Sequence, residues 1–158
     1  MYLQIPHRIA IERHGSGTPL LLIMGIGGQL IQWPESFVEG LITAGFDCIK
    51  MDNRDIGLSA KFIDGGMPRP RQMIAKYMLG LSVQAPYTLK DMAEDAAKVL
   101  AELDIARAHV VGISMGSMIA QILAAEHPEL VERLTLFHTN LGLRRDLPSP
   151  KAIAALIG

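Results

Sequence analysis

The sequence is short of cysteine and of charge of a single sign, and each shortage excludes a class of protein. Its one cysteine, Cys48, cannot form an intrachain disulfide, and its place in an apolar run predicts a buried core side chain rather than a reactive thiol. The formal net charge of −1 provides no positive field for nucleic acid or an anionic membrane surface. A neutral small molecule is therefore the expected partner.

The sequence also lacks a secretory leader and a long uninterrupted apolar run. Residues 1–8 show neither the basic start nor the long apolar stretch and small-residue cleavage site of a signal peptide. Residues 15–34 carry no Asp, Glu, Lys or Arg, but their five glycines and two prolines exclude a membrane helix. These features predict a cytoplasmic protein that does not enter a membrane.

What the 158 residues do contain is an alternation of strand-like and helix-like segments around one core, since 49% of them are hydrophobic. This alternation predicts an α/β fold with a doubly wound, mostly parallel sheet. Residues 60–87 interrupt it, and we expect a long surface excursion there with a short helix at 72–81. The expected strands are 2–5, 8–13, 20–24, 46–51, 108–113 and 132–138, and the expected helices are 35–44, 88–103 and 115–127.

The residues that carry chemistry are concentrated in G-x-S-x-G at 112–116, which directly follows a predicted buried strand and directly precedes a predicted helix. A sharp turn there needs residues without bulk, so Gly112 and Gly116 let neighbouring backbone approach closely. The turn pushes the hydroxyl of Ser114 into the open as a candidate nucleophile. The N–H of Met115, unpaired at the helix start, is placed to stabilise a negative oxygen.

A second glycine cluster, M-G-I-G-G at 24–28, follows the predicted strand 20–24 and can provide another such N–H, from Ile26. The strand, glycine turn and later Asp52 also suggest a dinucleotide-binding fingerprint, with the acid on a ribose. That interpretation fails in detail, because its third glycine falls on Leu30 and because Pro34 interrupts the required helix.

Three stretches together resemble the α/β-hydrolase superfamily. Residues 24–28 resemble its H-G-x-G-G turn, and residues 112–116 resemble its nucleophile elbow. Residues 52–59, D-N-R-D-I-G-L-S, look like its D-x-R-G-x-G-x-S loop, in the form of methylesterase-like members related to aclacinomycin methylesterase. The resemblance runs from residue 8 to residue 140. Two positions depart from it, with Met24 in place of a histidine and Asp55 in place of a glycine.

The resemblance implies an eight-stranded sheet, of which about six strands are expected here, and hydrolysis of esters without a metal or organic cofactor. It implies Ser114 as nucleophile and the N–H groups of Ile26 and Met115 as oxyanion donors. It divides the chain into the N-terminal part of a hydrolase core, 1–140, and the start of a lid, 141–158. It also implies that the triad acid and histidine follow on loops after later strands, so we expect a chain truncated before them.

The residues that are present offer no obvious substitute for that acid and base. We expect His127 to be a helix-terminal polar residue and His138, at the end of a strand, to be structural. Asp146, beside two arginines, is expected to be a solvated loop charge. The other histidines precede the elbow and show no metal-ligand spacing. Without a general base, Ser114 is a weak nucleophile.

Two functions of different classes therefore stay open. The first is a serine hydrolase of carboxylic esters whose full-length form is active while the isolated chain is nearly inert. The alternative is a short non-catalytic protein that binds a small apolar ligand or a partner chain. The sequence does not identify the ester or the oligomeric state. The strand 132–138 lacks the usual protections of an edge strand, so we expect the isolated 158-residue chain to self-associate through it.

Overall fold

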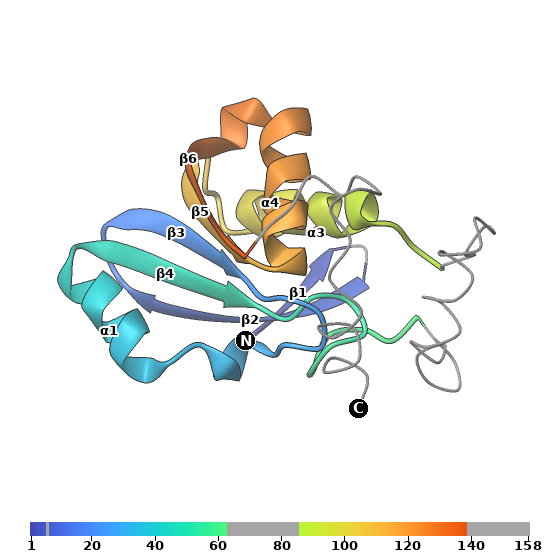
Figure 1. Cartoon of the computed structure of the whole chain (residues 1–158), viewed down its shortest axis with the longest axis horizontal. Coiled ribbons are helices and arrows are strands. Elements are labelled where there is room, and N and C mark those ends of the chain that lie inside the picture. The colour runs from blue at the N-terminus through green and yellow to red at the C-terminus, as the bar shows by residue number, and fades with distance from the viewer. Residues whose placement is uncertain (6, 63–85, 139–158) are drawn as a thin grey trace.

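The computed structural model describes residues 1–5, 7–62 and 86–138, which form a six-stranded sheet covered by helices (Figure 1). The strands are β1 (Tyr2–Ile5), β2 (His7–Gly15), β3 (Thr18–Ile23), β4 (Phe46–Met51), β5 (Ala108–Ile113) and β6 (Val131–Phe137). The helices are α1 (Glu35–Thr43), α3 (Leu89–Glu102) and α4 (Met115–Glu126), with short 3-10 turns η1 (Leu30–Gln32) and η2 (Pro128–Leu130).

The expected strands and the three longer helices are confirmed, and no boundary moves by more than two residues. The two 3-10 turns are additions that the sequence pattern did not predict. The short helix expected at 72–81 and the lid expected at 141–158 lie outside the described residues.

The sheet is mixed but mostly parallel, with strand order β1-β2-β4-β3-β5-β6. The strands β3, β4, β5 and β6 run parallel, whereas β2 pairs with β1 and with β4 in the antiparallel sense. The carboxyl ends of the four parallel strands therefore meet at one edge, where ligands bind in sheets of this kind. In Figure 1 the arrows of β3 and β4 point towards that edge, at which α4 begins.

Helices cover both faces of the sheet, as a doubly wound fold requires. Along β3, Leu21 and Ile23 belong to the core that includes side chains of α3 and α4. The alternate residues Leu20 and Leu22 belong to a second core formed with α1. Cys48 is fully buried in this second core, as expected, and burial raises the pKa of its thiol.

β6 is the last strand of the sheet, and within the described residues it pairs with β5 alone. Two of its apolar side chains remain open to solvent, because Leu134 is 36% exposed and Phe137 is 43% exposed. Among the described residues, exposed apolar side chains therefore coincide with a sheet edge on which no further strand pairs.

Candidate active site

Ser114 stands between β5 and α4, where it is the N-cap residue of the helix. It is exposed, and its φ of 54° is positive, which is uncommon for a residue with a side chain and stores strain in the turn. Its N–H donates to the carbonyl oxygen of Phe137 at 2.8 Å, so the strained turn is tied to the end of β6. The side chain is thereby held in the open at the carboxyl edge of the sheet.

The glycines on either side of Ser114 occupy places where a Cβ cannot fit. A Cβ on Gly116 would lie 2.2 Å from the carbonyl oxygen of Ile23, and one on Gly112 would lie 2.4 Å from that of Gly116. Both obstacles are backbone atoms, which cannot move aside as a flexible side chain does. Close backbone approach is thus the physical reason for glycine at both positions.

A second serine, Ser117, fixes the first turn of α4 from within. Its buried hydroxyl lies 2.6 Å from the carbonyl oxygen of Gly112 and 2.9 Å from that of Phe137, and it can donate to either. Ser117 therefore joins the helix to the ends of β5 and β6. This contact stabilises the elbow, whereas the hydroxyl of Ser114 is left exposed.

The glycine turn after β3 lies directly against Ser114. A Cβ on Gly25 would be 3.1 Å from the Cβ of Ser114 and 3.7 Å from its Oγ. Gly28 donates its N–H to the carbonyl oxygen of Gly25 at 3.1 Å, and Gly27 has a φ of 71°, as in a type II turn. This hydrogen bond does not use the N–H of Ile26. That the N–H groups of Ile26 and Met115 converge on one oxygen stays a prediction.

Asp52, at the end of β4, has a structural role that the sequence did not reveal. Its Oδ1 accepts from the N–H of Leu30 at 2.7 Å and its Oδ2 accepts from that of Leu58 at 3.1 Å, with the side chain buried. The carboxylate therefore joins the loop after β3 to the loop after β4. Because backbone N–H groups bind both oxygens, the structure adds a further reason against Asp52 as a ribose ligand.

Asn53, the next residue, was also missed as a functional candidate. Its Nδ2 donates to the carbonyl oxygen of Met24 at 3.0 Å, at the start of the glycine turn, and its side chain is 1% exposed. The D-x-R-x-x-G-x-S pattern at 52–59 was the sequence feature that could have pointed to Asp52 and Asn53, because both residues lie within it. The pattern alone did not show which backbone groups they hold.

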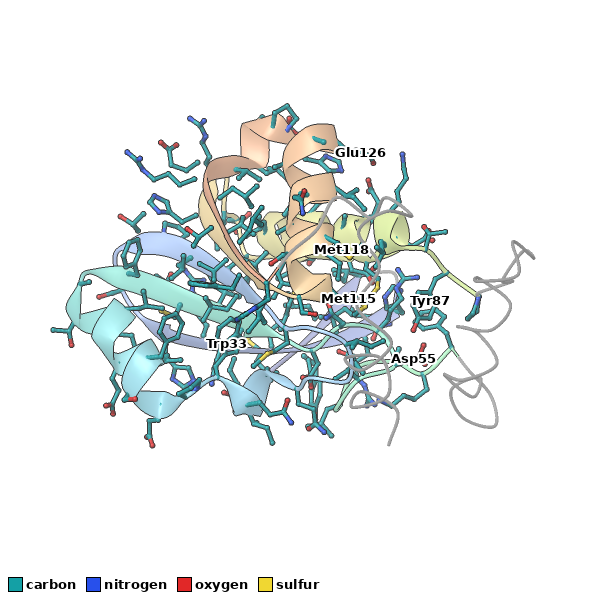
Figure 2. The ribbon with its side chains drawn as sticks, viewed as in Figure 1. Trp33, Asp55, Tyr87, Met115, Met118 and Glu126 are labelled. Carbon is teal, nitrogen blue, oxygen red and sulfur yellow. The ribbon has the colours of Figure 1, made fainter. Side chains whose placement is uncertain are left out.

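The residues after Asn53 fasten the loop that follows β4 to α3. Arg54 makes two hydrogen bonds to the carboxylate of Asp95. Leu58, further along the same loop, is exposed. Asp55 has a φ of 65°, which explains why glycine is common at this position of the motif. Burial and then a hydrogen bond to Asp55 raise the pKa of the Tyr87 phenol. Figure 2 shows Tyr87 and Asp55 next to one another.

The described residues do not supply a general base to Ser114, whose hydrogen bonds there all involve its backbone. His138 follows β6 with a φ of 52° and is exposed. His127 ends α4 and lies 2.8 Å from a carboxylate oxygen of Glu94, which lowers the pKa of that carboxyl. A structural role for His127 is consistent with this contact. Asp146 lies outside the described residues.

Two further absences hold for the parts of the chain that the structure describes. In residues 1–5, 7–62 and 86–138, no three His, Cys, Asp or Glu side chains gather in an arrangement that could hold a metal ion. None of the described helices has both the length and the apolar character needed to cross a bilayer.

Comparison with known proteins decides the family, since the model of the alpha/beta hydrolase fold matches residues 18–154. The chain belongs to the α/β-hydrolase fold family. A Mycobacterium tuberculosis protein provisionally named non-heme bromoperoxidase BpoC is 34% identical over 137 residues, 87% of this chain and 44% of that protein. The rhodomycin D methylesterase DauP of a Streptomyces species is 37% identical over 119 residues, 75% of this chain and 34% of that protein.

A solved structure from a study of carboxylesterases of Nitrososphaera gargenis is similar in both fold and sequence. It has a TM-score of 0.66 and 25% identity, and the match covers 86% of this chain and 44% of that chain. The chain thus spans less than half the length of these three proteins. Its six-stranded sheet is part of an α/β-hydrolase fold.

Proposed function

We propose that the chain carries the nucleophile half of a serine hydrolase of carboxylic esters, with Ser114 as the residue that forms the acyl-enzyme. One observation carries this proposal. Ser114 is exposed with a positive φ between β5 and α4, and the glycine turn of Gly25 packs against it. The esterase and methylesterase names of the similar proteins support the same reaction class.

The chemistry follows from the positions of these groups. The Oγ of Ser114 attacks the ester carbonyl carbon, its proton passes to a general base, and the carbonyl electron pair moves to the oxygen. That negative oxygen is stabilised by the N–H groups of Ile26 and Met115. Its collapse expels the alcohol, which takes up the proton, and water then hydrolyses the acyl-enzyme. No metal or organic cofactor enters these steps. The base is a histidine that the described residues do not provide.

Apolar side chains on the loops around the elbow favour a small apolar ester as substrate. Ile26 is 59% exposed, Ile31 is 69% exposed and Leu58 is 61% exposed. The carboxylate of Asp52 binds the N–H of Leu58 and that of Leu30, so the loops that carry these side chains are held together. An apolar acyl or alcohol group can cover such side chains and remove them from water.

The experiment is to express the protein over the whole reading frame of its gene and to measure hydrolysis of p-nitrophenyl butyrate. We expect turnover that Ser114→Ala abolishes. The matched control is Ser36→Ala. Ser36 is an exposed serine on α1, which packs on the face of the sheet opposite to α4. Retention of full activity in Ser114→Ala would refute the assignment of the nucleophile.

A second candidate function is a non-catalytic protein that binds a small apolar ligand or a partner chain. The exposed apolar side chains of Leu134 and Phe137 on the edge strand β6 favour it, since another strand can cover them. A protein of full gene length that binds esters without hydrolysing them would support this alternative.

A further inference from the structure

The loop that follows β3 is held at both of its ends by two adjacent residues at the end of β4. Asn53 binds the carbonyl oxygen of Met24, where the loop begins, through its Nδ2 at 3.0 Å. Asp52 binds the N–H of Leu30, where the loop ends, through its Oδ1 at 2.7 Å. Between these two contacts lies the turn that contains Ile26.

The contact of Asn53 has a defined chemical sense. A carbonyl oxygen can only accept, so the amide atom facing Met24 must be the N–H donor. Asn53 is 1% exposed, and water therefore does not replace this donor readily when it is lost. The same carbonyl is confined from a second side, because a Cβ on Gly116 would come within 2.6 Å of it.

Fixing the carbonyl of Met24 has a consequence for Ile26. The peptide unit is planar, so the direction of this carbonyl also sets the direction of the Gly25 nitrogen. Only the two dihedral angles of Gly25 then separate the fixed peptide from the N–H of Ile26. Glycine restricts its own dihedral angles less than any other residue does. The turn therefore depends on contacts outside itself, and Asn53 makes one at its start.

We propose that Asn53 is a positioning residue of the hydrolase, which aims the N–H of Ile26 at the oxygen that becomes negative when Ser114 attacks the ester. The inference rests on the proposed function. Asn53 acts through the hydrogen bond to Met24 and the turn that follows. Donors of this kind must lie close to the developing charge, so a displaced turn costs rate more than it costs substrate binding.

The test is the variant Asn53→Asp in the protein of full gene length. This exchange removes the N–H donor and keeps the shape of the side chain. A carboxylate cannot donate to Met24, so we expect kcat for p-nitrophenyl butyrate to fall by about 10-fold to 100-fold while KM stays nearly constant. Asn53→Ala removes the donor without adding charge and should lower kcat in the same way. Thermal melts establish that each variant is folded at the assay temperature.

The matched control is Asp47→Asn, the reverse exchange near the start of β4, whereas Asn53 follows the end of that strand. Asp47 is 4% exposed, and its Oδ2 accepts a hydrogen bond from the Nη2 of Arg13 at 2.6 Å. It has no hydrogen bond to the glycine turn among the described residues. We expect this variant to lose stability and to keep its kcat.

A spectroscopic arm, in the protein of full gene length, does not depend on activity. In Asn53→Asp we expect the carbonyl carbon-13 resonance of Met24 and the amide resonances of Gly25 and Ile26 to move, while Asp47→Asn leaves all of them in place. Unchanged resonances in a folded Asn53→Asp variant would overturn the inference, whether or not the protein hydrolyses esters.

The kinetic outcomes separate the two proposals. If the wild-type protein turns over and Ser114→Ala does not, but Asn53→Asp keeps the wild-type kcat, the positioning role is wrong and the proposed function stands. If Ser114→Ala is as active as the wild type, the proposed function itself is wrong, and so is a role of Asn53 in aiming a donor for it.

Discussion

Arg54 and Asp95 form a paired set of hydrogen bonds between the loop after β4 and helix α3. Nε of Arg54 lies 2.7 Å from Oδ2 of Asp95, and Nη2 lies 2.8 Å from Oδ1. Both side chains are almost fully buried. The guanidinium also lies 5.0 Å from the ring centres of Phe62 and Tyr87, and its Nη2 donates to the carbonyl oxygen of Asp91.

Breaking this pair should be expensive. Arg54→Met leaves the carboxylate of Asp95 buried without its main partner, so we expect the free energy of unfolding to fall by about 3–5 kcal/mol. Urea denaturation at pH 7 measures it. Lys90→Met is the control, because the pair of Lys90 with Glu126 is exposed and should contribute little. Equal midpoints for the two variants would show that the buried pair does not stabilise the fold.

Two glycine-to-alanine exchanges should change stability in opposite directions. In Gly116→Ala the new methyl group meets backbone 2.2 Å away, so we expect a loss of about 1–3 kcal/mol together with loss of esterase activity. In Gly40→Ala the added Cβ on α1 has no atom within 4 Å, so we expect a gain of about 0.5–1 kcal/mol. Denaturation midpoints of both variants provide the measurement. A tolerated Gly116→Ala would contradict the close packing of α4 on β3.

The start of α3 should make stability depend on pH in the acid range. Asp91 accepts from the hydroxyl and the N–H of Thr88, and these hydrogen bonds hold the pKa of its carboxyl below the usual 3.8. The stabilisation is therefore complete above that value and is lost as the pH falls through the lower folded-state pKa. Asp91→Asn should be less stable than the wild type at pH 7, and this difference should shrink below pH 3.8. A pH-independent difference in urea midpoints would contradict this account.

The 158-residue chain by itself should hydrolyse esters at no more than a residual rate. The described residues offer Ser114 no hydrogen-bonded base, and loss of triad members in serine hydrolases costs several orders of magnitude. Turnover of p-nitrophenyl butyrate by this chain and by the protein of full gene length gives the comparison. Robust turnover of the short chain that Ser114→Ala abolishes would refute the prediction and would make His138 the first base to test.

The same short chain should self-associate through β6. Leu134→Lys places a charge on this edge and should reduce the scattering of concentrated solutions. Tyr2→Lys, on the edge strand β1 at the other end of the sheet, should leave association unchanged. Static light scattering of the wild-type chain, Leu134→Lys and Tyr2→Lys measures their association. A wild-type chain that stays monomeric at high concentration would contradict this prediction and would instead favour a short non-catalytic protein that covers this edge with its own residues.

Much of the fold follows from local sequence signals. The apolar run 20–24 predicted a central strand, and Thr88 as N-cap predicted the start of the helix 88–103, because burial on both faces and capping leave short-range patterns. The position of Ser114 between strand and helix followed in the same way, since the glycines beside it are adjacent in sequence.

What only the tertiary structure decided are the contacts between loops that are distant in sequence. The amide of Asn53 reaches Met24, the carboxylate of Asp52 reaches Leu30, and Arg54 reaches Asp95. No local pattern encodes these partners, because they depend on which strands lie side by side in the sheet. The sequence by itself determined where strands end and which small residues follow them. The order of the parallel strands determined that the glycine turn packs against Ser114 and that the end of β4 holds this turn in place.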